Sequence, residues 1–113
     1  MSPITTHVLD TARGRPADGV PITLEHEHAD GWVLLGSGKT DGDGRLRTLL
    51  VEGSALERGT YRITFDTRAY FAAQGVTSFY PVVQVVFTIA APSEHHHVPL
   101  LLSPYGYSTY RGS

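Results

Sequence analysis

Apolar and polar residues alternate with a period of two along most of this chain, and turn-forming residues interrupt the alternation about every ten positions. In residues 20–27, for example, Val20, Ile22 and Leu24 alternate with Thr23 and Glu25. Successive side chains of a β-strand point to opposite faces, so this pattern predicts strands that each bury one face. Further strands are expected over residues 4–10, 32–40, 46–51, 60–68, 79–90 and 95–103.

Seven or eight short strands without an internal repeat predict an all-β fold, a two-sheet sandwich of immunoglobulin size. One short helix is expected over residues 69–74, with Gly75 at its C-terminal boundary. The segment 95–103 is expected to be the last full strand. The remaining tail carries Tyr105, Tyr107 and Tyr110, and such an aromatic segment is expected to dock onto a surface, which includes the surface of another subunit.

The composition places the chain among globular proteins. Its 113 residues predict a single domain, residues 1–113, and 41% hydrophobic with 18% charged residues is typical of a chain with a packed core. A net charge of −2 provides no basic face, so nucleic acid is not an expected partner. No apolar run reaches the roughly 18 residues of a membrane span. The cysteine-free chain begins without a secretory pattern, so cytoplasmic localisation is expected.

Six histidines, three of them consecutive, suggest imidazole chemistry. Period-2 geometry places His95 and His97 on one face of their strand and His96 on the other. A solvated or hydrogen-bonded polar face explains such a pair. The alternative is a zinc site whose third ligand would come from a carboxylate or from one of the histidines elsewhere in the chain, His7, His26 or His28. The residues alone leave both interpretations open.

Two other positions are candidates for a functional site. His7 lies in the first predicted strand and shares a face with Thr5. Arg45 follows directly after Asp41-Gly42-Asp43-Gly44, a run that favours a hairpin turn and lacks the spacing and distal Glu of a calcium loop. Taken singly, a strand histidine is more often a structural residue and a post-turn arginine more often a surface cation.

A resemblance to a known family rests on three segments. They are the opening Ile4-Thr5-Thr6-His7-Val8-Leu9-Asp10-Thr11-Ala12-Arg13-Gly14, the turn Thr40-Asp41-Gly42-Asp43-Gly44-Arg45 and the ending Tyr110-Arg111-Gly112-Ser113. Together they closely resemble the 5-hydroxyisourate hydrolases, the transthyretin-related family of urate breakdown. The likeness runs from about Ile4 to Ser113.

The resemblance implies a transthyretin-like sandwich of two four-stranded sheets with one short helix. It also implies a homotetramer, a dimer of dimers, with active sites in the channel between dimers. The site residues that it carries over are His7, Arg45, His97, Tyr110 and Ser113. The position between the paired histidines, often aromatic in the family, is His96 here.

The implied reaction is hydrolysis of 5-hydroxyisourate to 2-oxo-4-hydroxy-4-carboxy-5-ureidoimidazoline, by attack of water on a ring carbonyl. His7 and His97 would activate water and transfer protons, and Arg45 would orient the ring and stabilise developing negative charge. Tyr110 would hydrogen-bond the substrate, and Ser113 with a free terminal carboxylate would position the water or a histidine. No metal and no cofactor are required. The alternatives are a transthyretin-like carrier that binds a planar ligand without turnover, and a secreted zinc-binding interaction module.

Overall fold

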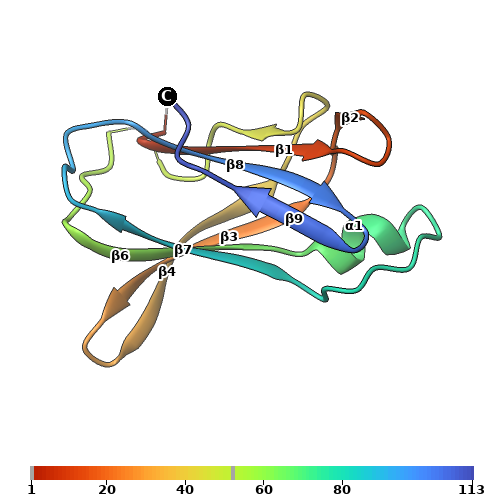
Figure 1. Ribbon diagram of the computed structural model, residues 1–113. Helices are drawn as coiled ribbons and strands as arrows, with labels where there is room; N and C mark the ends of the chain where they lie inside the picture. Colours follow the sequence, from red (N-terminus) through yellow and green to blue (C-terminus); the bar gives the residue numbers. More distant parts are fainter. Residues whose placement is uncertain (1, 52) are drawn as a thin grey trace.

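The computed structural model describes residues 2–51 and 53–113. Figure 1 shows two β-sheets stacked face to face with one short helix at one end of the stack. This architecture confirms the predicted all-β, transthyretin-like sandwich. The elements are β1 (Ile4–Asp10), β2 (Arg15–Pro16), β3 (Pro21–His28), β4 (Gly31–Lys39), β5 (Arg45–Leu46), β6 (Gly59–Phe65), α1 (Thr67–Ala72), β7 (Val83–Ile89), β8 (His96–Ser103) and β9 (Gly106–Thr109).

The strand order brings distant parts of the chain together. The first sheet has the order β2–β1–β8–β9, with β5 paired to β1 beside β2, and the second has the order β4–β3–β6–β7. The first sheet thus has five strands and not the four that the resemblance implies, because the short strands β2 and β5 both pair with the same side of β1. Among the described residues, the strands pair antiparallel except for β1 with β8, which pair in parallel. The beginning and the end of the chain therefore lie side by side in one sheet (Figure 1).

The core lies between the two sheets and follows the predicted alternation. In β3 and β6 every second residue is buried, including Leu24 and Ile63. Val8 and Leu100 face them from the first sheet and are also fully buried. Burying a side chain of this size contributes roughly 1.5–3 kcal/mol, so the two apolar faces supply most of the force that holds the sheets together.

The helix begins two residues earlier than the sequence pattern predicts. It spans Thr67–Ala72, and Asp66 precedes it as an N-cap whose Oδ1 accepts a hydrogen bond of 3.1 Å from the Ala69 amide. A capping carboxylate satisfies an amide that the first helical turn leaves free, so it determines where the helix starts. The apolar residues Tyr70 and Phe71 are buried, as expected of the inner face.

Three predicted strands are shorter than expected. The strand predicted over residues 60–68 ends at Phe65, because Asp66 caps the helix that follows. The segment 46–51 contributes only its first residue to β5, because Leu49 and Leu50 bury their side chains in the core without strand pairing. The segment 79–90 narrows to β7, which starts at Val83. Pro81 lacks the amide proton that a sheet ladder needs, and the preceding Phe79 amide donates to the Pro104 carbonyl instead.

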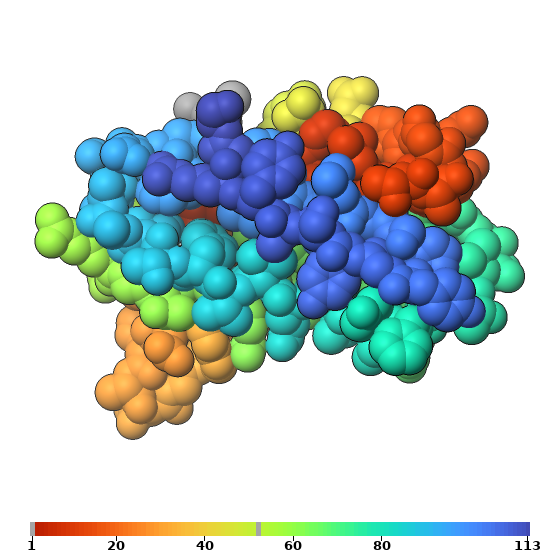
Figure 2. Space-filling view, in the orientation of Figure 1, coloured from red at the N-terminus to blue at the C-terminus, as the bar shows by residue number. Residues whose placement is uncertain are grey.

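The prediction that residues 95–103 form the last full strand was wrong. The tail forms a further strand, β9, that pairs antiparallel with β8, Leu100 opposite Thr109 and Leu102 opposite Tyr107. The aromatic tail thus docks onto its own chain, and Figure 2 shows the C-terminal segment lying across the surface of the first sheet. The pattern concealed this strand because its outward positions are polar and exposed.

The hairpin of β3 and β4 projects from the body of the sandwich (Figures 1 and 2). Beyond the cover of the first sheet it exposes Val33, Leu34 and Leu35. Among the residues described, no helix has the length and apolar character needed to cross a membrane.

Candidate active site

Strand β1 is the centre of the site because it pairs on one side with β5 and on the other with β8. Antiparallel pairing places His7 opposite Arg45, and parallel pairing places Thr5 opposite His97. Opposite residues of neighbouring strands share a face, so these four side chains belong to one face of the first sheet. The alternate residues, such as Leu46, face the core.

A hydrogen-bonded turn holds Arg45 in place. Asp41 Oδ1 accepts hydrogen bonds from the amides of Asp43 (2.9 Å) and Arg45 (3.0 Å), and the Arg45 amide bond is the leading cause that lowers the pKa of the Asp41 carboxyl. Gly44 has φ +76°, and its carbonyl accepts from the Val8 amide at 2.7 Å. A Cβ at Gly44 would lie 2.4 Å from the Val8 carbonyl oxygen, so glycine is required here. The turn is thereby fastened to β1.

One hydroxyl joins two of the three consecutive histidines. Thr5 Oγ1 lies 2.9 Å from His95 Nε2 and 2.8 Å from His97 Nδ1. Thr5 is buried, with 7% of its surface exposed, whereas His95 is exposed and His97 is half-buried. The predicted placement of His95 and His97 on one face is confirmed by this shared partner.

The electrostatic surroundings favour the neutral form of His97. Burial is the main cause that lowers its pKa below the usual 6.5, and the positive charge of Arg45 and the neighbouring His7 and His95 act in the same direction. Hydrogen bonding at the Thr5 backbone opposes the shift. A neutral imidazole at physiological pH can accept a proton, which is the property that a general base requires.

The end of the chain packs against the same imidazole. The Gly112 amide donates a hydrogen bond of 2.8 Å to the His97 carbonyl, which extends the pairing beyond β9. A Cβ on Gly112 would lie 2.6 Å from His97 Cδ2, so the glycine allows the backbone to lie against the ring. An exposed ion pair of 2.9 Å between Arg111 and Glu94 fastens the tail nearby.

These groups surround a cavity of about 400 Å³, here called the imidazole cavity. Such a volume suits a small polar ring compound. The cavity combines proton-accepting imidazoles with two guanidinium groups. It is lined by Thr5, Thr6, Arg45, Arg47, His95, His97 and Ser113.

The structure brings some predicted site residues together and separates others. Arg45, His97 and Ser113 line the imidazole cavity, and His7 lies beside it as the strand partner of Arg45. Tyr110 does not line it. That side chain is 58% exposed and borders a second cavity of about 270 Å³, which is also lined by part of β7, by His96 and by His97, so His97 lines both cavities.

The residue pattern did not reveal the importance of Thr5 and Arg47. Thr5 could have been found from the period-2 pattern, which places it on the same face as His7, but a threonine gives no chemical signal by itself. Arg47 follows Arg45 by two residues and its guanidinium lies 3.0 Å from Asp41 Oδ2. Arg47 lies one residue beyond β5, and both arginines line the imidazole cavity.

The zinc interpretation requires three or more suitable side chains close together. Within residues 2–51 and 53–113, no group of three or more His, Cys, Asp or Glu side chains is placed to hold a metal ion. Among the same residues His96 Nδ1 is the one buried side-chain nitrogen or oxygen without a hydrogen-bond partner, and it faces away from His95 and His97.

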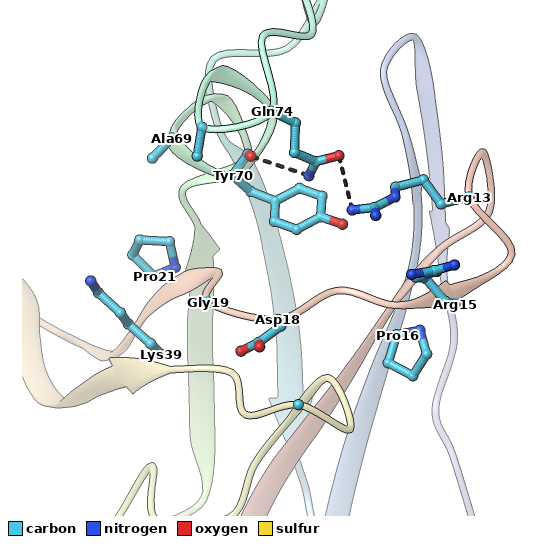
Figure 3. Close-up of a pocket in the computed structure, with 12 residues that line it drawn as sticks. Arg13, Arg15, Pro16, Asp18, Gly19, Pro21, Lys39, Ala69, Tyr70 and Gln74 are labelled. Atoms are coloured by element: carbon cyan, nitrogen blue, oxygen red, sulfur yellow. Dashed lines mark hydrogen bonds between the residues drawn. The ribbon is translucent and has the colours of Figure 1, made fainter.

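A larger cavity, of about 610 Å³, lies at the other end of the sandwich beside α1 (Figure 3). We call it the helix cavity. It is lined in part by Arg13, Arg15, Asp18, Lys39, Tyr70 and Gln74. Arg13 donates a hydrogen bond of 3.2 Å to Gln74 Oε1, and the Tyr70 hydroxyl donates to Asp10 at 2.7 Å. No histidine is among its lining residues.

The two-sheet sandwich, with a cavity lined by imidazoles and guanidinium groups beside β1, is the architecture of a transthyretin-like protein. The chain belongs to the HIUase/Transthyretin family, whose match covers residues 4–112. A relative from Mus musculus named 5-hydroxyisourate hydrolase is 50% identical over 114 residues, which cover 99% of this chain and 96% of the relative.

Solved structures of both branches of the family resemble this chain. Sea bream transthyretin in complex with thyroxine superposes with a TM-score of 0.90 at 38% identity, over 98% of this chain and 95% of that one. The 5-hydroxyisourate hydrolase of Klebsiella pneumoniae superposes with a TM-score of 0.84 at 37% identity, over 97% and 92%. The fold is therefore shared by a carrier and an enzyme, and the side chains of the site must separate them.

Proposed function

We propose that this protein hydrolyses 5-hydroxyisourate, a cyclic amide formed in urate breakdown, by attack of water on a ring carbonyl. The observation that carries the proposal is that the pairing of three strands brings Arg45 and His97 to one cavity, with His7 beside it as the strand partner of Arg45. The relatives named 5-hydroxyisourate hydrolase support the same substrate.

His97 is the favoured general base. Its Nδ1 is occupied by Thr5, so Nε2 is the nitrogen left for a water molecule in the cavity. As water attacks the carbonyl carbon, Nε2 takes its proton and the carbonyl electrons move to oxygen. Collapse of that intermediate breaks the ring C–N bond, and a proton returns to the leaving nitrogen. His7 is placed to take part in this second transfer. Acid–base assistance of this kind contributes about 10²–10⁴-fold.

Arg45 is the group that stabilises the developing oxyanion. Its guanidinium is always charged and only donates hydrogen bonds, which suits a negatively charged oxygen. The Asp41 turn holds the backbone of Arg45 beside His7, so the charge is positioned before the substrate arrives. Donors held in this way are worth about 3–4 kcal/mol of transition-state stabilisation.

Tyr110 and Ser113 are proposed to complete the site in a homotetramer, a dimer of dimers. Ser113 lines the imidazole cavity of its own chain, while Tyr110 extends from the exposed edge of the first sheet. A neighbouring copy packed on this face would close the open side of the cavity and bring further side chains to the substrate. Sedimentation analysis of the purified protein tests the assembly, and a monomer with full activity would refute it.

Carriage of a planar ligand without turnover is the second candidate, favoured by the superposition on the thyroxine complex of sea bream transthyretin. The charged and imidazole-rich cavity argues against it, since an apolar ligand bound there would leave these groups without hydrogen bonds to water. We further propose that residues 1–113 act as one domain in the cytoplasm, where a chain without cysteine needs no disulfides.

The direct test follows freshly generated 5-hydroxyisourate by its near-ultraviolet absorbance. The signal should decay much faster with the protein than without it, and equal rates would reject the enzymatic function. A chain lacking residues 110–113 should be inactive while its sandwich remains folded. Full activity of that truncated chain would remove Tyr110 and Ser113 from the site.

A further inference from the structure

A single buried hydroxyl connects the candidate base to an exposed histidine. The Thr5 Oγ1 atom lies within hydrogen-bond distance of His97 Nδ1, at 2.8 Å, and of His95 Nε2, at 2.9 Å. Thr5 is a residue of the β1 strand, and both histidines approach it from the start of β8, through the parallel pairing of these strands. This contact joins residues 90 and 92 positions apart in the sequence.

The shared hydroxyl makes the position of the proton on one imidazole depend on its position on the other. A hydroxyl donates one proton, so Thr5 donates to one ring nitrogen and accepts from an N–H on the other. When both rings are neutral, two arrangements satisfy all three groups. In the first, His97 carries its proton on Nδ1 and donates to Thr5, which donates to His95 Nε2. In the second, His95 carries its proton on Nε2 and donates to Thr5, which donates to His97 Nδ1.

The cavity selects the first arrangement. The guanidinium groups of Arg45 and Arg47 line the same cavity as His97, and both are cationic and donate only. Their positive charge favours a lone pair on His97 Nε2 and disfavours an N–H bond there. The proton of His97 then lies on Nδ1 and points at Thr5.

We propose that Thr5 and His95 are positioning residues that form a proton relay with His97, a role that rests on the proposed hydrolysis. When water attacks, its proton bonds to His97 Nε2, the Nδ1 proton passes to Thr5 Oγ1, and the hydroxyl proton passes to His95 Nε2. Three bonds to hydrogen form and three break. His97 ends neutral in its other tautomer, Thr5 is unchanged, and the positive charge resides on His95.

The relay moves the positive charge to the side chain that bears it best. His97 is half-buried, and the groups that share its surroundings are Arg45, Arg47, His7, His95 and the terminal residue Ser113. Burial lowers the pKa of His97, and Arg45, His7 and His95 act in the same direction, so an imidazolium there is disfavoured. His95 is exposed, and water solvates its charge and accepts its proton.

The first test measures the tautomer of His97 by nitrogen NMR of the ring, at about pH 8, where imidazoles are neutral. In the unmodified protein Nδ1 should carry the proton and Nε2 should not. Thr5→Val keeps the shape of the side chain but removes the hydroxyl, and should shift the proton toward Nε2. Thr5→Ser should restore the original tautomer. Thr67→Val, which changes another buried threonine far from the cavity, is the matched control and should leave the His97 signals unchanged.

The second test measures hydrolysis. Thr5→Val should lower kcat about 10–100-fold with little change in KM, Thr5→Ser should recover most of the rate, and His95→Ala should resemble Thr5→Val. Because His95 is exposed, free imidazole in solution should restore part of the rate to His95→Ala and none to Thr5→Val. The dependence of kcat on the fraction of heavy water should indicate that several protons move in the rate-limiting transition state of the unmodified enzyme. In Thr5→Val it should indicate one.

The outcomes separate the relay from the proposed function. A His97 proton on Nε2 in the unmodified protein, or a Thr5→Val variant with unchanged tautomer and unchanged kcat, would overturn the relay while leaving hydrolysis intact. An unmodified protein that does not hydrolyse 5-hydroxyisourate would overturn the proposed function and the transfer step together, and the NMR measurement would still decide how the three groups share their protons.

Discussion

The imidazole cavity and the helix cavity differ in chemistry more than in size. The helix cavity is larger, about 610 Å³ against about 400 Å³, and both contain two arginines. In the helix cavity local hydrogen bonds hold two polar side chains: Arg13 donates to Gln74 (Figure 3), and the buried Tyr70 donates to Asp10. Burial and the Asp10 bond raise the pKa of Tyr70, so it keeps its proton.

In the imidazole cavity the titratable groups are arranged in the opposite way. The pKa of His97 is lowered, so the ring is ready to accept a proton near neutral pH, and a second imidazole is linked to it through Thr5. The comparison teaches that volume and positive charge do not make an active site here. What distinguishes the imidazole cavity is an imidazole whose lowered pKa favours the neutral, proton-accepting form.

The largest effect should follow from removing the candidate base. His97→Asn preserves a polar side chain but cannot act as a base near pH 7, so kcat should fall about 10²–10⁴-fold. Steady-state assay of 5-hydroxyisourate decay measures it. His28→Asn on the projecting hairpin is the control and should retain full activity. If both variants kept the wild-type rate, the assignment of the imidazole cavity as the active site would be refuted.

The two arginine sets can be compared directly. Arg45→Ala should lower kcat about 10²–10³-fold, because it removes the charge that stabilises the oxyanion. Arg15→Ala removes the same group from the helix cavity and should change kcat less than twofold. The reverse ranking would assign the reaction to the helix cavity.

A smaller effect is expected at the contact between the tail and the base. Gly112→Ala places a Cβ 2.6 Å from His97 Cδ2, so the ring or the tail must shift, and kcat should fall about tenfold. Gly42→Ala, beside the helix cavity, meets open space within 4 Å and should be neutral. Equal rates for the two variants would show that the tail does not position the imidazole.

The pH dependence should reflect the lowered pKa of His97. A base must be neutral, so the midpoint of the acid-side decline in kcat/KM should lie below pH 6.5. The unfolded chain binds the His97 proton from about pH 6.5 downward and the folded chain binds it only at lower pH, so folding stability should also decrease as the pH falls through this region. His97→Asn should reduce that slope in urea titrations. A decline of kcat/KM whose midpoint lies well above pH 6.5 would contradict the assignment.

The smallest effect is expected in the helix cavity. Arg13→Ala removes an exposed hydrogen bond to Gln74, and the free energy of unfolding should fall by less than about 1 kcal/mol, with kcat unchanged. Urea denaturation measures this change. A large loss of activity would mean that the two cavities are coupled.

Most of the fold was predictable because its determinants are local. Alternation in residues 20–27 and 60–65 specifies strands with one buried face, and the Asp-Gly run before Arg45 specifies a turn. The predicted hairpin at this turn was wrong, because β4 and β5 lie in different sheets and do not pair with each other. The predictions of element boundaries and of the last strand failed where the local sequence signal was weak or where a contact distant in sequence determined the structure. The helix start depended on the Asp66 cap, and β9 is a strand because β8 pairs with it, although its own residues are mostly polar.

The site was predictable only in part. Its imidazoles and Arg45 carry a chemical signal in the sequence, and the resemblance to the family drew attention to them. Their roles as catalytic residues stay predictions, as do those of Tyr110 and Ser113. The position of Thr5 between two histidines could not be predicted, because nothing near Thr5 in the chain indicates which strand will lie beside it.

The amino-acid sequence by itself determined the two-layer β architecture, the faces on which the histidines lie and the family to which the chain belongs. Tertiary structure alone decided that β1 pairs in parallel with β8, that Gly112 lies against His97 and that a threonine links two imidazoles. The physical reason is range. Side-chain alternation and turn conformation depend on neighbours in sequence, whereas strand partners and hydrogen-bonded protons depend on groups some ninety residues away that meet only when the sheet has formed.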